Sequence, residues 1–203
     1  DSVMRWNHVA PNDVRIDPSI SNVVEMVILT ENYYNNIVSW SNNPTGDFPA
    51  EPTSAQLSVN FASLNQYKAA SDTITYRSAK FVRLFGPSAS KDLQAVFRIV
   101  KLSDQYSDNE LKSRVLTAIK QYFDPQNWEF GETFFFTELS TYIHQQLGSA
   151  IGSIVILPKN SSGTFGELFE VKAMSNELFI STATVNELEI INQIDNQTLR
   201  ADR

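Results

Sequence analysis

Carboxylates are the side chains in this sequence that could most readily take part in a reaction. Asp124 and Glu129 could form the acid pair of a glycosidase, which needs two carboxyl groups facing one cleft. Asp124, however, precedes Pro125, and the residue before a proline is pushed out of the helical region. It is therefore better explained as the end of a helix, and Glu129 as the polar member of an aromatic turn.

Metal binding has two sets of candidate ligands. Asp104, Asp108 and Glu110 have acidic spacing but lack the glycine and the full ligand set of a calcium loop, so their position indicates interaction with a helix dipole. His8 and His144 are the only histidines, and His144 has no acidic or histidine neighbour at the spacing of a zinc helix. We interpret both as ordinary histidines. The sequence predicts no metal and no cofactor.

Two glycine-containing segments could be read as catalytic or phosphate-binding loops. The first, Gly148-Ser149-Ala150-Ile151-Gly152, has the wrong glycine spacing for a nucleophile elbow and joins a helix to a strand. We interpret it as a helix C-cap and a turn. The second, Gly86 to Lys91, lacks the second glycine and the Ser or Thr of a phosphate loop. Neither segment predicts an enzyme.

Composition restricts the class of partner. The chain has 203 residues, a formal charge of −7 and no cysteine, which excludes disulfides and thiolate chemistry. The negative charge argues against a broad nucleic-acid or anionic-membrane surface, and no run of eighteen apolar residues is present. We expect protein partners instead. Because the first residue is Asp1 rather than methionine, we also expect the chain to be a fragment of a longer protein.

The elements that must position these side chains centre on residues 93–157. An apolar strand from Leu93 to Leu102 precedes a helix that starts at the capping box Ser107–Glu110, in which Glu110 should reach back to the Ser107 amide. A second helix should start at the N-cap Thr137, and a buried strand should end at Pro158. This order, strand, helix, helix and strand, predicts an α/β layer with one helical face.

Earlier and later segments extend this pattern. We predict a strand over 22–30, a helix over 31–41 capped by Thr30, a helix from Thr53 or Ser54 to Ala69, and a long strand over 74–85 antiparallel to the strand that follows it. Segments 168–173 and 177–182 read as a hairpin. The predicted class is α+β, with mixed or antiparallel sheets and helix pairs on one face. The predicted organisation is an N-terminal arm (1–21), two similar strand–helix–helix–strand lobes (22–85 and 86–160), and a C-terminal hairpin and tail (161–203).

Aromatic side chains are concentrated between the two central helices. Three consecutive phenylalanines in an extended segment cannot all face one core, so at least one should point outward. A second core under the helix pair and a protein-binding anchor explain this concentration equally well. As interaction candidates we select aromatic residues of this segment and of the arm: Trp6, Trp128, Phe130, Phe134 and Phe136.

Two parts of the sequence resemble known proteins, and this resemblance implies a fold without assigning contact residues. The segments Ala95–Val100, Gln121–Pro125, Trp128–Glu132 and Gly152–Ile156 resemble the C-terminal module of baseplate J-type wedge proteins of contractile phage tails. The opening part, with Asp17-Pro18-Ser19, Val27–Thr30 and Asn32-Tyr33-Tyr34, is similar to the large dimeric wedge subunits of T-even-like baseplates.

The resemblance implies a structural role. It implies a subunit of the virion tail baseplate, assembled in the host cytoplasm, that forms a homodimer or higher assembly and joins wedges into a ring around the hub. Other wedge proteins would be its partners, and no catalytic residue comes with the family. Two other classes stay open: a phage-tail hydrolase of cell-envelope polysaccharide, which needs two carboxylates in a cleft, and a peptide-binding adaptor that uses a sheet edge.

Overall fold

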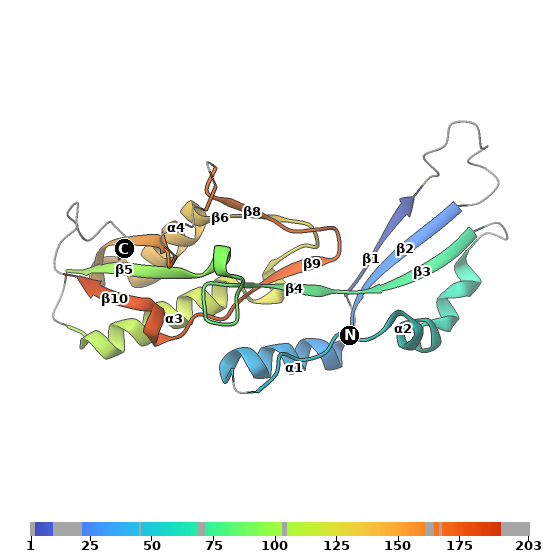
Figure 1. Ribbon diagram of the computed structural model, residues 1–203, viewed down its shortest axis with the longest axis horizontal. Helices are drawn as coiled ribbons and strands as arrows, with labels where there is room; N and C mark the ends of the chain where they lie inside the picture. The colour runs from blue at the N-terminus through green and yellow to red at the C-terminus, as the bar shows by residue number, and fades with distance from the viewer. Residues whose placement is uncertain are drawn as a thin grey trace. The chain divides into compact units, whose positions relative to one another are not determined.

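The protein has two compact units, Asp1–Lys80 and Phe81–Arg203 (Figure 1). The computed structural model describes residues 3–9, 22–44, 46–68, 72–102, 105–160, 165–166 and 168–191. Helices and small sheets of parallel and antiparallel strands alternate along the chain, which confirms the predicted α+β class. The similarity between the two lobes stays a prediction.

The first unit contains a three-stranded sheet in the order β1-β2-β3. Strand β2 (Asn22–Leu29) pairs with β1 (Val3–Val9) in antiparallel orientation and with β3 (Asp72–Ser78) in parallel orientation. The prediction of an arm over 1–21 is therefore wrong for residues 3–9. These residues have little periodicity of their own, but β2 supplies hydrogen-bonding partners along their whole length. Residues 10–21 lie outside the described part of the chain.

The helices of the first unit begin where their caps predict. Helix α1 (Glu31–Asn42) starts after Thr30, whose hydroxyl accepts a hydrogen bond from the Tyr33 amide at 3.3 Å. Helix α2 (Ser54–Asn60) starts after Thr53 in a capping box with Gln56. The predicted continuous helix to Ala69 is wrong, because the backbone leaves helical geometry at Phe61 and a 3₁₀ segment, η1 (Ala62–Tyr67), follows.

A small core holds this unit together. Ile28, Leu57 and Tyr76 are buried against one another, and the Tyr76 hydroxyl donates to the Phe61 carbonyl oxygen at 3.1 Å. That hydrogen bond joins β3 to the point where α2 ends. The predicted strand over 74–85 is interrupted at Ala79, so β3 and β4 (Lys80–Leu84) are separate strands.

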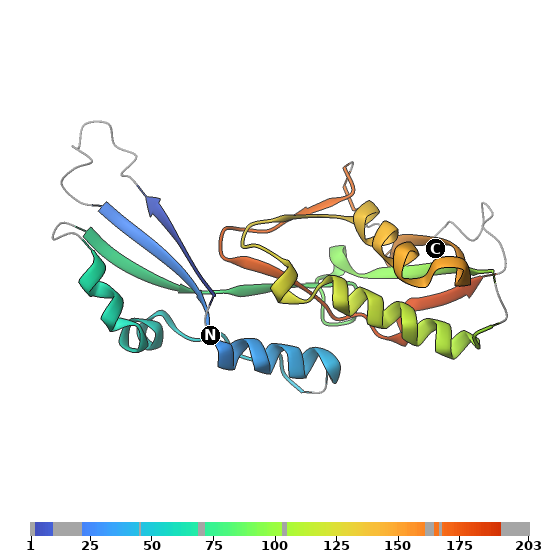
Figure 2. The ribbon, with the colours of Figure 1, turned by 180° about the vertical axis from the view of Figure 1, so that it is seen from behind.

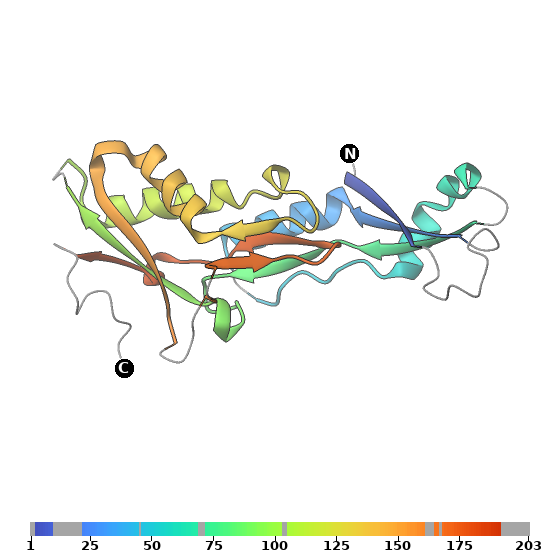
Figure 3. The same ribbon diagram turned by 90° about the horizontal axis from the view of Figure 1, so that it is seen from above.

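The second unit is built on β5 (Ala95–Lys101), the middle strand of the sheet β10-β5-β7. Strand β7 (Ile151–Pro158) is antiparallel to β5, and β10 (Leu188–Ile191) is parallel to it. Helices α3 (Asp108–Tyr122) and α4 (Phe136–Leu147) lie together on one face of this sheet (Figures 2 and 3). Their apolar sides bury a core with Phe97 and Ile99 of β5.

Short segments connect these elements. They are η2 (Lys91–Leu93), η3 (Pro125–Asn127), η4 (Gly148–Ala150) and η5 (Val185–Glu187). Helix α4 begins one residue before the predicted N-cap Thr137, after Phe135. Ser107 does cap α3, through its hydroxyl and the Glu110 amide, but the Glu110 carboxylate binds Arg114 at 3.2 Å.

Two predicted strand pairings are wrong. Segments 168–173 and 177–182 contain strands β8 (Glu170–Lys172) and β9 (Glu177–Ser181), but β8 pairs with β6 (Thr133–Phe135) and β9 pairs with β4. The turn between them has hairpin length, yet it joins strands of different sheets. Likewise, β5 takes β7 and β10 as neighbours rather than the strand before it. Local patterns predict strands, whereas distant segments decide which strands pair.

Candidate interaction surfaces

The aromatic residues predicted as interaction anchors form a core instead. Phe130, Phe134 and Phe136 are buried, and Trp128 is partly buried against the same cluster. The ring of Trp128 stacks on Phe123 with centroids 5.6 Å apart, and its indole N–H donates to the Tyr122 carbonyl oxygen at 2.8 Å. The expectation that these side chains are exposed at subunit contacts is therefore wrong for this segment.

The geometry of β6 explains which phenylalanine faces outward. Successive side chains of a strand point to opposite faces, so Phe134 enters the core while Phe135 is 37% exposed. Phe136 then begins α4 and turns inward again. The sequence predicts one outward ring in the triplet, and that ring is Phe135, which was not among the candidates. Trp6 lies in β1 opposite Met26, and its side chain is outside the described part.

The candidate acids have structural partners. Asp124 caps η3, accepting a hydrogen bond from the Gln126 amide at 3.0 Å. Asp108 binds Lys101 at 3.0 Å. Glu129 is exposed, and its amide donates to the Glu132 carboxylate at 2.9 Å. Asp104 lies outside the described residues.

The other chemical candidates also have local roles. Gly148 has a φ of 52° and caps α4, donating to the His144 carbonyl oxygen, as the C-cap interpretation predicts. Among the residues that the structure describes, no group of three or more His, Asp or Glu side chains is placed to hold a metal ion. No helix in the described ranges is long and apolar enough to cross a membrane. His8 lies in β1, opposite Val24.

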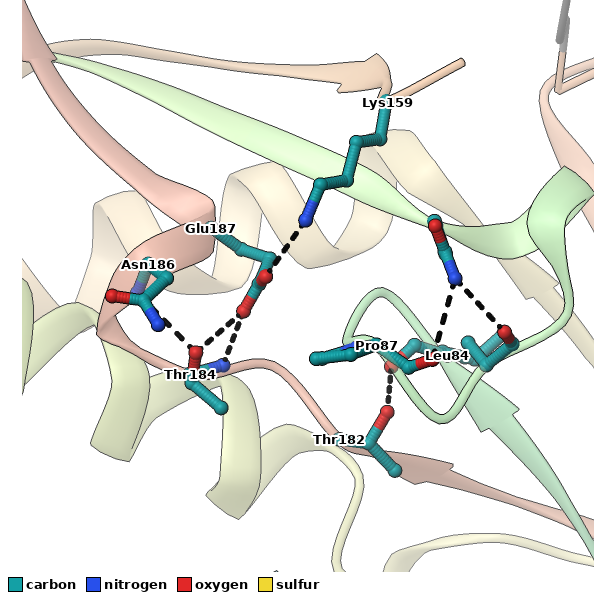
Figure 4. A network of polar contacts seen from close by, with 9 residues as sticks. Leu84, Pro87, Lys159, Thr182, Thr184, Asn186 and Glu187 are labelled. Carbon is teal, nitrogen blue, oxygen red and sulfur yellow. Dashed lines mark hydrogen bonds and ion pairs between the residues drawn. The ribbon is translucent and has the colours of Figure 1, made fainter.

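A buried carboxylate that sequence analysis missed is Glu187, which is 1% exposed (Figure 4). It accepts hydrogen bonds from the Thr184 amide at 2.9 Å and the Thr184 hydroxyl at 2.7 Å, and it binds Lys159 at 3.1 Å. The signal for it was the capping-box pattern Thr184-x-x-Glu187. Because Thr184 and Lys159 hold the chain before β10 next to the end of β7, the role of this carboxylate is to position strands.

Each unit has a hollow that described residues line. The larger, about 920 Å³, lies between the starts of α1 and α2 and is lined mainly by amide and hydroxyl side chains. Glu51 is the one carboxylate among its described lining residues, and its side chain is 3.9 Å from Lys80. This groove therefore does not present the pair of carboxylates that a glycosidase needs.

The smaller hollow, about 360 Å³, lies beside α4 and is lined by Tyr122, Glu138 and Tyr142 among others. The Tyr122 hydroxyl donates to the Glu138 carboxylate at 3.4 Å. Burial, and then the nearby charge of Glu138, raise the pKa of Tyr122 well above its usual range. The phenol therefore stays protonated in the folded protein at neutral pH.

This raised pKa predicts a loss of stability at alkaline pH. The unfolded chain releases the Tyr122 proton near the ordinary value of about 10, whereas the folded chain retains it. Protonated Tyr122 therefore contributes its full stabilisation of the folded state below about pH 10, and this stabilisation is lost as the pH rises further. We expect Tyr122→Phe to flatten the decline of the urea midpoint above about pH 10. Tyr67→Phe, at an exposed tyrosine, is the control, and an equal effect of both variants would contradict the prediction.

Exposed apolar side chains lie near the end of the two-stranded sheet where β6 ends and β8 begins. Phe135 is 37% exposed, Leu168 71% and Phe169 53%. Phe135 pairs with Glu170, and the Phe136 amide donates to the Phe169 carbonyl oxygen at 3.1 Å, so the three residues lie at one end of the two-stranded sheet. We call Phe135, Leu168 and Phe169 the ribbon-end patch.

The backbone at the ribbon-end patch is strained. Phe169 has a φ of 48°, a left-handed conformation that bulky side chains rarely adopt. A glycine would adopt it without cost, yet the chain places an exposed phenyl ring there. The residues around Phe169 must therefore stabilise this conformation.

Comparisons with known proteins leave the family open. No protein-family model matches the sequence, and no curated protein matches it significantly.

Proposed function

We propose that this chain is a structural subunit of the tail baseplate wedge of a contractile phage, which self-associates and links wedges into a ring around the hub. Its place is the virion, after assembly in the host cytoplasm. The sequence resemblance supplies the class of assembly. The single structural observation that supports it is the ribbon-end patch, whose exposed rings are available to a neighbouring wedge protein.

The patch has the chemistry of a protein contact. Aromatic residues concentrate at the centres of protein interfaces, where they bury much area with few rotatable bonds. Phe169 and Leu168 are mostly exposed, so truncating them removes little packing within the chain. The ion pair between Glu170 and Lys172 at 3.0 Å, on the adjacent strand β8, supplies a polar border.

A double variant, Leu168→Ser with Phe169→Ser, tests this role. We expect phage carrying it in the complete protein to accumulate wedges without assembled baseplates in electron micrographs. Because both side chains are exposed, the free energy of unfolding of the chain should change by no more than about 0.5 kcal/mol per substitution. Val59→Ser, another exposed apolar position, is the control and should assemble normally. Normal baseplates from the double variant would remove the patch from the proposal.

Two measurements on the unmodified chain separate the functional classes. Sedimentation should show at least a dimer at high concentration, and a turbidity assay on peptidoglycan should show no clearing. Clearing would replace the structural role with the hydrolase. A peptide-binding adaptor is the second candidate, because β7 is a long strand with β5 as its one strand neighbour in the described chain. A monomer that binds an extended peptide would favour that adaptor.

A further inference from the structure

Strand β7 is an uncharged strand at a sheet edge. Within the described residues, its one strand neighbour is β5, and its eight residues, Ile151 to Pro158, carry no charge. Edge strands usually carry charged side chains, because exposed N–H and C=O groups invite pairing with another chain. The opposite edge strand, β10, contains Glu189, and the edge strand β3 contains Asp72 and Arg77. The β7 edge lacks this protection over most of its length.

The register shows which backbone groups face the edge. The Lys159 amide donates to the Gln94 carbonyl oxygen at 2.9 Å, and Pro158 lies opposite Ala95. In an antiparallel ladder the hydrogen-bonded pairs alternate, so Val155 also bonds to β5 while Ile154 and Ile156 point their N–H and C=O groups away from it. Pro158 falls at an outward position, where its missing N–H costs no ladder bond.

We propose that the β7 edge pairs with the same edge of a second copy of this chain, in antiparallel orientation about a two-fold axis at Val155. In this register Ile154 lies opposite Ile156 of the second copy. Each outward N–H group of these two residues then meets an outward C=O group. The inference rests on the self-association in the proposed function and assigns its contact.

The pattern of β7 favours a second copy over an unrelated strand. Because β7 carries no charge, two copies of this edge can face each other without bringing like charges together. A two-fold axis at Val155 then places each outward N–H group of Ile154 and Ile156 opposite an outward C=O group. Directly opposite residues of an antiparallel pair share a face, so the buried side of β7, which contacts α4, continues as the buried side of the second copy. The result is one continuous sheet with both helix pairs on the same face.

Charge near the proposed axis does not oppose the pairing. Arg98 lies opposite Val155 on β5, and two such cations would approach each other across the axis. The Arg98 guanidinium, however, binds the Glu189 carboxylate at 2.9 Å from the side away from β7. Each copy therefore brings a compensated pair to the axis rather than a bare positive charge.

Two charge variants at Val155 test the axis. Val155→Glu and Val155→Lys each place like charges directly opposite each other across the two-fold, which destabilises a strand pair. We expect each variant alone to sediment as a monomer at concentrations where the unmodified chain is dimeric. Mixing the two variants places Glu opposite Lys, so the mixture should recover the dimer. Val155 is half-buried, and thermal unfolding of each variant verifies that the fold is intact.

A matched control and three outcomes decide the inference. Val96→Glu places the same charge on the same face of the central strand β5, and it should leave association unchanged. Association of the unmodified chain that both Val155 variants preserve would overturn the β7 contact and leave the proposed self-association intact. An unmodified chain that is monomeric throughout would remove self-association itself. Loss of association in the variants without recovery on mixing would overturn the two-fold register.

Discussion

Phe134→Ala should lower the free energy of unfolding by about 3–5 kcal/mol, the usual cost of removing a buried phenyl ring. Phe134 is fully buried, and its ring contacts Phe123 at 5.0 Å and Phe136 at 4.8 Å between centroids. The ring also meets Phe85 and Phe179, which come from distant parts of the chain. No nearby group can fill the space without disturbing this cluster, so a cavity remains.

Phe135→Ala is the matched control, because it removes the same ring one residue further along the same strand. The Phe135 side chain is 37% exposed, so we expect Phe135→Ala to lower the free energy of unfolding much less than Phe134→Ala does. Urea unfolding followed by tryptophan fluorescence measures both, since Trp128 lies 6.2 Å from the Phe134 ring. Equal losses from the two variants would contradict the placement of Phe134 in the core.

Gly86→Ala should lower the free energy of unfolding by a similar amount, about 3 kcal/mol or more. Gly86 follows the point where β4 and β9 meet, and a Cβ there would overlap the Thr182 carbonyl oxygen. That backbone is held in place, because the Thr182 amide donates to the Leu84 carbonyl oxygen at 2.9 Å. The Thr182 hydroxyl donates to the same oxygen at 3.1 Å (Figure 4). The backbones at Gly86 and Thr182 must therefore separate to accommodate one methyl group, although hydrogen bonds hold them together.

Gly152→Ala separates this effect from the general cost of replacing glycine. A Cβ at Gly152 would meet only the end of the Leu102 side chain, which is exposed and can rotate away. Urea unfolding measures the free energy of unfolding of both variants. We expect Gly152→Ala to lower it by at least about 2 kcal/mol less than Gly86→Ala does. A similar small loss at both glycines would show that the β4 and β9 backbones can separate at Gly86.

Elements defined by local chemistry could be predicted from the sequence. Thr30 and Ser107 accept the capping hydrogen bonds expected of them, and Pro125 begins a new turn after α3. The apolar run before Pro158 forms β7 as predicted. In each case the determining contacts lie within a few residues of one another, so the sequence pattern contains the information.

Features that depend on distant segments could not be predicted. The turn before β9 has the residues of a hairpin turn, but β9 pairs with β4. The hydrogen bond from Thr182 to Leu84 beside this pair joins residues 98 positions apart. The burial of Phe134 rather than Phe135 depends on where β8 meets β6. The prediction of an exposed aromatic surface was wrong for the same reason. A concentration of aromatic residues in the sequence does not show which of their rings the fold buries.

The central position of β5 has a consequence during synthesis on the ribosome. Arg98 of β5 and its partner Glu189 of β10 are 91 positions apart, and a ribosome adds about 5–20 residues per second. One side of the nascent strand β5 therefore waits roughly 5 to 20 seconds for β10, after α3, α4 and β7 have already been made. Another chain on the same polysome can pair with the vacant side of β5 in this interval, so β10 competes with that chain for its place in the sheet. We expect the final residues of the sheet, although few, to control the yield of correctly folded protein.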